Sequence, residues 1–393
     1  MRARVSRILP HITVWRVIFA AILLSGLYAT YLRIFYGLGG STNLSDRFPW
    51  GLWIGFDVMC GVGLAAGGFT LVAMVHIFNI RQYRPILRPA ILTAFLGYLL
   101  VTVGLLYDVG RPDRMWHPLV MWNPHSVMFE VAWCVTLYST VLFLEFLPIV
   151  FERFGLHKPM EWIHRISVPL MILGVLLSTL HQSSLGSLYL IVPTKLYPLW
   201  YSPLLPLLFY VSAIGVGLAM TIFESWHSSR AFGRALELPL LASMARVLAV
   251  LMSVYLWIRF LDLVHRDALG LLLQNRTETW LFALEIALMA IPTLLLYQAR
   301  IRFNPHALYF CAVMIVLGFV ANRLNVGITG IEAGSGAHYF PKWTEVAVTL
   351  SICAAGFAIF RIVGQYFPIF EAHSSGHASA AVEERETDSV GVS

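Results

Sequence analysis

The chain has 393 residues, of which 58% are hydrophobic and only 12% charged, and its mean hydropathy is +0.74. A soluble domain carries about 25% charged residues. This composition therefore excludes an ordinary soluble protein and indicates an integral membrane protein.

Ten segments are long and apolar enough to cross a bilayer, for which a helix needs about 20 residues. Membrane β-barrels would instead show alternating segments of about ten residues, which this sequence lacks. We therefore predict an all-α membrane protein with ten transmembrane helices. Their approximate ranges are 15–36, 50–78, 88–108, 125–151, 165–192, 202–226, 238–264, 277–299, 306–324 and 343–366.

The basic residues predict the orientation of these helices. Of the 27 Lys and Arg residues, 17 fall on the side that carries both termini, eight on the opposite side, and Arg33 and Arg259 lie inside spans. By the positive-inside rule, residues 1–14 and the tail 367–393 are cytoplasmic. We expect no cleaved signal peptide and a disordered polar tail. The net charge of +6 then reflects topology, and nucleic acid is not an expected partner.

The four cysteines lie singly in different spans, without a CxxC or CxxCH motif: Cys60, Cys134, Cys311 and Cys353. Iron–sulfur clusters and c-type haem need such spacings. We interpret these cysteines as packing residues, and we predict no metal site in this chain.

Ionisable residues inside the spans gather at particular depths. Asp57 lies about 10 Å beneath Trp50, and Glu130 about 9 Å beneath Pro124, on the non-cytoplasmic side. His181 lies near mid-membrane. Four further carboxylates are candidates for a proton path: Glu145 and Glu224 toward the cytoplasm, and Asp262 and Glu285 toward the opposite side.

A charged residue inside a span costs a few kcal/mol, so each is a functional candidate. Each could equally be a partner in a hydrogen bond between helices. The three- and four-residue steps between Trp50, Trp53 and Asp57 predict that they share one helical face. An aromatic-lined opening above a carboxylate would suit a flat, proton-exchanging ligand. Aromatic belts and close packing explain the tryptophans equally well, but they leave Asp57 unexplained.

The segment 108–130 places two histidines, two tryptophans and several prolines at the predicted membrane mouth. Its prolines favour an ordered, non-helical path. Histidine titrates near neutral pH and suits proton exchange with a redox-active ring. His117 and His125 are therefore candidate site residues.

Three stretches carry a resemblance to a known family: "PWGLWIGFDVMCGVGLAAGGF", "GRPDRMWHPLVMWNPHSVMFEVAWCVTLYSTVLFLEFLP" and "HQSSLGSLYLI". They closely resemble the membrane subunit of the bidirectional nickel–iron hydrogenase of enterobacteria, within the wider family of nitrite- and polysulfide-reductase membrane anchors. The resemblance covers nearly the whole transmembrane region.

The resemblance implies a quinone-reactive subunit of the bacterial inner membrane, without haem. It implies two four-helix bundles, about 50–192 and 202–324, flanked by the first and tenth helices. Electrons would come from a periplasmic ferredoxin-like [4Fe–4S] subunit, which serves the small and large hydrogenase subunits. The implied quinone pocket lies near the outer side of the first bundle. Carried onto this sequence, it comprises Trp50, Trp53, Asp57, His117, Asn123, His125, Glu130 and His181.

We therefore expect electron transfer to menaquinone or ubiquinone, with Asp57, His125 and Glu130 holding the ring oxygens or passing protons. Protons reach the quinone either from the periplasm or across the membrane. The same anchor role for a molybdenum enzyme or a multihaem cytochrome is the main alternative. A haem b cytochrome would need a second axial histidine to pair with His181, and a secondary transporter would show broken helices and repeated halves.

Overall fold

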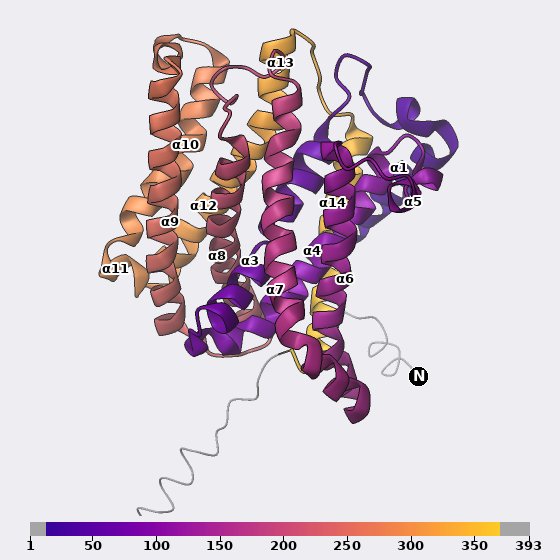
Figure 1. Cartoon of the computed structure of the whole chain (residues 1–393), viewed down its shortest axis with the longest axis vertical. Helices are drawn as coiled ribbons and strands as arrows, with labels where there is room; N and C mark the ends of the chain where they lie inside the picture. The colour runs from indigo at the N-terminus through magenta and orange to yellow at the C-terminus, as the bar shows by residue number, and fades with distance from the viewer. Residues whose placement is uncertain (1–12, 370–393) are drawn as a thin grey trace, which may run out of the picture.

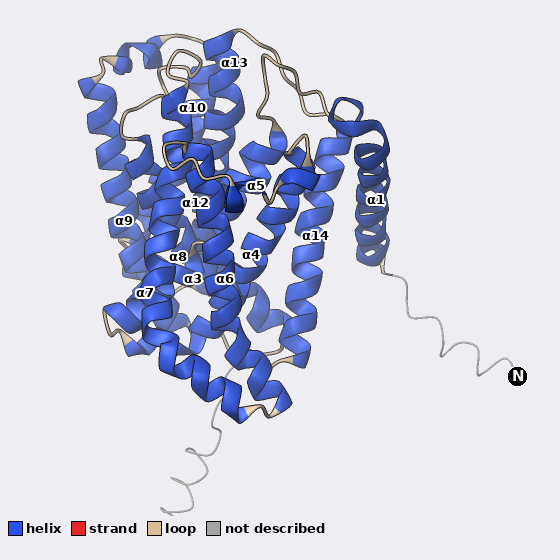
Figure 2. Ribbon diagram, turned by 45° about the vertical axis from the view of Figure 1, so that its right-hand side comes forward, coloured by secondary structure: helices blue, strands red, loops and turns tan. Residues whose placement is uncertain are grey.

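The computed structural model describes residues 13–369. Within this range the chain is helical, with a single isolated β-bridge between Ser45 and Phe48, and ten helical segments are long and apolar enough to span a membrane (Figure 2). The predicted all-α membrane fold is confirmed. Most of the predicted N-terminal segment and of the predicted polar tail, residues 1–12 and 370–393, lies outside the described residues.

The spans follow the predicted order, and several are longer than predicted. The first to fifth are α1 (Val14–Ser41), Trp53–Ile77, Arg81–Asp108 with α4 (Leu87–Asp108), α6 (Val127–Phe154) and His157–Ile191 with α7 (His157–Ser187). The sixth to tenth are α8 (Leu205–Ala231), α9 (Leu238–His265), α10 (Thr277–Leu296), Pro305–Ser335 with α12 (Pro305–Leu324), and α14 (Trp343–Tyr366).

Short helices mark the two ends of the bundle (Figure 1). One end carries α5 (His117–Val120) and α13 (Gly330–Ser335), and we name it the outer face. The opposite end carries α11 (Ala299–Arg302), and we name it the inner face. The outer face corresponds to the side with fewer basic residues in the sequence.

The helices pack in an arrangement that follows chain order. The second span, α4, α6 and α7 contact one another, as do α8, α9, α10 and α12. The two groups meet where α8 packs against α7 and α3 (Gly67–Val72). Helices α1 and α14 pair with each other, and α14 also packs on α4, so α1 stands at the edge of the molecule (Figure 2).

The second span is not a regular α-helix. Its outer end, η2 (Trp53–Val58), and its inner end, η3 (Ala73–Ile77), are π-helical, and a turn at residues 65–66 separates α2 (Met59–Leu64) from α3. Single π-turns in helices often accompany functional sites. Wider turns also change which side chains share a face, so 3.6-residue periodicity does not apply here.

Two helices approach closely because neither has a side chain at the crossing. A Cβ atom on Gly217 of α8 would lie 2.6 Å from the backbone nitrogen of Gly67, and one on Gly67 would lie 2.9 Å from the Gly217 carbonyl oxygen. Small residues let backbones approach in this way where lipid supplies no hydrophobic driving force. This crossing joins the two groups of helices.

Gly217→Ala should therefore destabilise the protein by about 1–3 kcal/mol, because α3 and α8 must separate to admit the methyl group. The thermal-unfolding midpoint in mild detergent measures this effect. Gly270→Ala is the control, since a Cβ there meets no atom within 4 Å. Equal midpoints for the two variants would contradict the tight crossing.

Candidate functional site

Asp57 lies in η2 and faces the tenth span. Asp57 is 5% exposed, and its carboxylate accepts a 2.9 Å hydrogen bond from Thr349 Oγ1 of α14. On the other side, a Cβ at Gly104 of α4 would lie 2.9 Å from Asp57 Cβ. The glycine therefore creates the space into which Asp57 fits.

Trp53 also faces α14, whereas Trp50 does not. Trp53 is 1% exposed, and its indole nitrogen donates to the Glu345 backbone oxygen at 3.2 Å. Trp50 precedes the helix, is half-buried, and its ring meets Tyr189 edge-on at 5.8 Å between centroids. The prediction that Trp50, Trp53 and Asp57 share one helical face is wrong, because the helix begins after Trp50 and its first turns are π-helical.

Residues that sequence reasoning did not select complete the surroundings of Asp57. Arg33 of α1 donates to the backbone oxygens of Tyr107 and Val109 at 2.7 and 2.8 Å. Between them, Asp108 has a buried Oδ1 without a hydrogen-bond partner. A charged residue inside the first span, Arg33, was the feature of the sequence that pointed to this cluster. The sequence did not show that Arg33 would bind the end of α4.

The connection before α14 closes the same region from the outer face. The Tyr339 hydroxyl accepts from the Leu52 backbone nitrogen at 2.8 Å and donates to the Glu345 carboxylate. Burial, together with the hydrogen bond to Glu345, raises the pKa of Tyr339. Tyr339 therefore acts as a neutral donor that joins η2 to α14.

Glu130 lies on a different side, at the outer end of α6. Its side chain is exposed, and Oε1 lies 2.5 Å from the Ser184 hydroxyl of α7. Ser126 caps the helix by accepting from the Phe129 backbone nitrogen at 3.4 Å. A carboxylate in the first turn is also favoured by the helix dipole.

Aromatic rings surround this end of α6. The Trp122 and Trp133 rings lie 5.0 Å apart, with Phe129 5.9 Å from Trp122. The Trp133 indole donates to the Pro118 backbone oxygen at 2.8 Å, which ties the outer loop to the helix. Glu130 lies between Phe129 and Trp133 in the sequence of α6, so we name this ring cluster at the outer face, Trp122, Phe129 and Trp133, the aromatic mouth.

The predicted loop residues lie around this mouth, and none is deeply buried. His117 is half-buried with its ring 4.4 Å from that of Trp116, while Asn123 and His125 are exposed. At the loop's start, the hydrogen bond from Arg111 holds the pKa of Asp113 below its usual value.

His181 lies in the interior of the first group of helices and is fully buried. Its Nδ1 lies 3.0 Å from the Tyr98 hydroxyl, and the Tyr98 ring meets the Tyr138 ring edge-on at 4.5 Å. Its Nε2 is buried without a partner. Next to it, Gln182 donates to the Val62 backbone oxygen at 3.1 Å.

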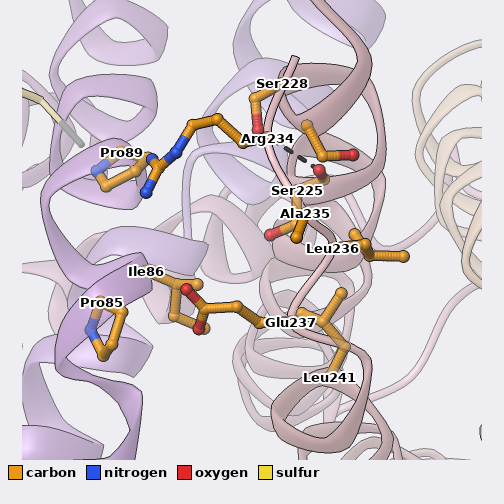
Figure 3. Close-up of a pocket in the computed structure, with 11 residues that line it drawn as sticks. Pro85, Ile86, Pro89, Ser225, Ser228, Arg234, Ala235, Leu236, Glu237 and Leu241 are labelled. Carbon is orange, nitrogen blue, oxygen red and sulfur yellow. Dashed lines mark hydrogen bonds between the residues drawn. The ribbon is translucent and has the colours of Figure 1, made fainter. Parts of the chain in front are cut away.

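Two carboxylates lie toward the inner face. Glu145 of α6 has a buried Oε1 without a partner, near Gly174 of α7. Glu224 of α8 accepts from Thr93 Oγ1 of α4 at 2.6 Å. A pocket lies between the start of α4 and the segment that follows α8, and Ser225, the residue after Glu224, lines it (Figure 3). Its lining includes Pro85, Pro89, Ser225, Ser228, Arg234 and Glu237.

The other two predicted proton-path residues belong to fixed networks. Glu285 is 0% exposed, and its carboxylate accepts from Trp200, Asn322 and Asn325 at 2.7–2.9 Å. Asp262 forms a 2.7 Å ion pair with Arg266 and accepts from Ser202 at 2.7 Å.

The predicted site residues therefore do not form one cluster. Asp57 and Trp53 face α14, Glu130 faces α7, His181 faces α4, and His125 lies on the outer loop. Among residues 13–369, no hydrogen bond or ion pair joins Asp57, His125 and Glu130. The depths calculated from the sequence put Asp57 and Glu130 at a similar level in the membrane. They could not show that the two side chains point toward different helices.

The histidines do not fit a haem held by two axial imidazoles. Such a site needs two histidines at matching depth from different helices, and His181 is the one buried histidine in the described part of the chain. No group of three or more His, Cys, Asp or Glu side chains there could hold a metal ion.

Known proteins resemble this chain over most of its length. The family described as "Polysulphide reductase, NrfD" matches residues 40–333. A protein of Nitratidesulfovibrio vulgaris is 37% identical, covering 91% of this chain and 94% of its own length. The probable Ni/Fe-hydrogenase 2 b-type cytochrome subunit of Escherichia coli is 34% identical over 86% and 87%. The integral membrane subunit of menaquinone reductase of N. vulgaris is 29% identical over 88% of each chain.

The family match does not include α14 and includes only the last two residues of α1. Arg33, Glu345 and Thr349, which surround Asp57 and Asp108, therefore lie outside the matched core. The matched range, residues 40–333, covers more than half of the chain. The chain belongs to the NrfD polysulphide reductase family of membrane subunits.

Proposed function

We propose that this chain is the quinone-reactive membrane subunit of an oxidoreductase complex. It would pass electrons between an iron–sulfur partner at the outer face and menaquinone or ubiquinone in the bilayer. The exposed Glu130 carboxylate, hydrogen-bonded to Ser184 beside the aromatic mouth, is the observation that carries this proposal. Two relatives support it, since their names specify a hydrogenase subunit and a menaquinone reductase subunit.

Reducing a quinone to a quinol takes two electrons and two protons. A flat ring can stack on Trp122, Phe129 or Trp133, while a carboxyl group nearby exchanges protons with a ring oxygen. Glu130 fits that role because it is exposed at the mouth. The buried imidazole of His181 is one helical turn away from Ser184 along α7, and it can serve as a second proton-exchanging group.

We propose separate roles for Asp57 and His125. Asp57 is held by Thr349 away from Glu130, so it would act from the opposite side of η2. His117, Asn123 and His125 lie where a partner or bulk water can reach them. We propose that this loop mediates exchange between the mouth and the outer aqueous phase.

The electron donor would dock at the outer face. The loop around α5 carries several exposed apolar side chains: Trp116, Val120, Met121 and Trp122 are 54–67% exposed. The hydrogenase relative favours a nickel–iron hydrogenase as the source of electrons. A ferredoxin-like [4Fe–4S] subunit would carry the electrons from that enzyme to this chain. A molybdenum enzyme or multihaem cytochrome would use the same surface in the alternative assignment.

We propose that the outer face is periplasmic and that both termini are cytoplasmic in the bacterial inner membrane. This orientation follows from the excess of Lys and Arg on the inner side. It places the electron donor outside the cytoplasm. The source of the protons then decides whether quinone reduction conserves energy.

Glu130→Gln should lower the rate of quinone reduction by the assembled complex about 100-fold, because an amide cannot exchange the proton. Oxidation of the electron donor with an artificial acceptor should be unchanged. Glu278→Gln is the control, since Glu278 is likewise a carboxylate in the first turn of a helix, α10, away from the loop around α5. A normal quinone rate in Glu130→Gln would remove Glu130 from the reaction.

Glu285→Gln should instead destabilise the fold by about 3 kcal/mol, because a buried carboxylate with three donors becomes an amide that mismatches them. Quinone turnover per folded molecule should remain normal. The unfolding midpoint and the turnover rate test both statements, with Glu278→Gln in the first turn of α10 as the control. If Glu285→Gln were stable but did not reduce quinone, Glu285 would instead belong to the proton path.

A further inference from the structure

Buried polar atoms without partners are concentrated between two neighbouring helices. Tyr138 of α6 and Ser178 and His181 of α7 are at most 1% exposed, and each has a side-chain atom without a hydrogen bond of normal geometry. The Ser178 hydroxyl does interact with the hydroxyls of Tyr98 and Tyr138, whereas His181 Nε2 and Glu145 Oε1 have no partner. Ser139 and Glu145 of α6 also have such atoms. These five form the larger part of the unpartnered buried side-chain atoms in residues 13–369.

These residues face one another along an antiparallel helix pair. On α7, Gly174, Ser178 and His181 recur at steps of four and three, so they share one face. On α6, Tyr138 packs on that face, and a Cβ at Gly174 would lie 3.6 Å from Glu145 Oε1 and 3.8 Å from the Tyr138 ring. We name this surface the α6–α7 seam: Glu130, Tyr138, Glu145, Gly174, Ser178 and His181.

Buried polar groups in proteins are nearly always hydrogen-bonded, and ordered water supplies the partner where protein does not. A water needs a polar site with two to four partners. The seam offers hydroxyl, imidazole and carboxylate groups in succession, and Gly174 leaves room beside Glu145. We infer that the seam holds a file of internal water molecules, which carries protons from the inner half of the membrane to the outer site.

Both ends of the seam lead to exposed or accessible groups. At the outer end Glu130 is exposed beside Ser184. Glu130 and Glu145 are 15 residues apart on α6, which corresponds to about 22 Å, or most of a 30 Å hydrocarbon core. At the inner end the path would continue from Glu145 to the Thr93–Glu224 pair of α4 and α8, and Ser225, which follows Glu224 in the chain, lines the pocket of Figure 3.

The titratable groups that face the seam come from three helices. They are Glu130, Cys134, Tyr138 and Glu145 from α6, His181 from α7 and Tyr98 from α4. Each proton taken up at the inner end leaves at the outer end, so the seam itself is neither oxidised nor reduced. This proton-carrying role rests on the proposed quinone chemistry, whereas the presence of water does not.

Hydroxyl-radical labelling of the intact protein in detergent tests for the water. Radicals formed from internal water modify adjacent side chains even where bulk solvent cannot reach. Tyr138 should be labelled well above Tyr189, which is equally buried at 1% exposure but whose hydroxyl has a partner, Met59 Sδ, at 3.1 Å. Equal protection of both tyrosines would overturn the inference.

Tyr138→Phe tests the proton role in the complete complex reconstituted in vesicles. The variant removes one hydroxyl and keeps the ring, so it should fold. Quinone reduction should fall about tenfold or more, while donor oxidation with an artificial acceptor stays unchanged. In the unmodified complex, the compartment at the inner face should become alkaline during turnover.

Leu137→Phe is the matched control, since Leu137 is 40% exposed on α6, the helix that carries Tyr138. Normal turnover in Tyr138→Phe, or alkalinisation only at the outer face, would overturn the proton role. A complex with unmodified sequence that fails to reduce quinone would instead refute the proposed function. The labelling result would be unaffected by that failure.

Discussion

Inside a bilayer, every buried polar group must find its hydrogen-bond partner within the protein, because lipid offers none. An unsatisfied group costs several kcal/mol there, which is comparable to a large fraction of the stability of a whole domain. The placement of nearly every polar side chain in this chain follows from that constraint. Where buried polar groups have partners in the protein, their hydrogen bonds fix the helices relative to one another. Where such a group has no partner in the protein, another molecule, such as water, is expected to supply one.

The second group of helices comes closer to meeting the constraint with protein atoms alone, although Arg259 Nε of α9 is buried without a hydrogen-bond partner. Glu285 joins α10 to α12 through Asn322 and to the loop before α8 through Trp200. Arg323 then donates to Ser212 of α8 and lies 3.6 Å above the Phe209 ring. Such a saturated network suits a rigid scaffold, since each charge has several partners and no mobile water is required.

The first group of helices differs, because its polar groups are only partly satisfied. Between α6 and α7, the Nε2 of His181 and the Oε1 of Glu145 have no hydrogen-bond partner in the protein. Near the outer face, Asp108 is in the same situation while Arg33 donates to the backbone on either side of it. Helices α1 and α14 hold this region together from outside the family core.

The amino-acid sequence by itself determined the all-α membrane fold, the number and order of the spans and the family. Long apolar segments can only become helices in lipid, and contiguous motifs such as "PWGLWIGFD" identify relatives without any knowledge of packing. It also placed Asp57 and Glu130 near one depth, since depth follows from the 1.5 Å rise per residue.

Only the tertiary structure decided the direction in which each of these groups points. The π-helical turns of η2 rotate Asp57 toward Thr349, although regular 3.6-residue spacing would align it with Trp50. The pairing of Glu130 with Ser184, of Tyr98 with His181 and of Arg33 with the end of α4 joins residues 54 to 83 positions apart. Partners so distant in sequence depend on which helices pack together, and that choice rests on small residues and interhelical hydrogen bonds, which leave no periodic signal in one sequence.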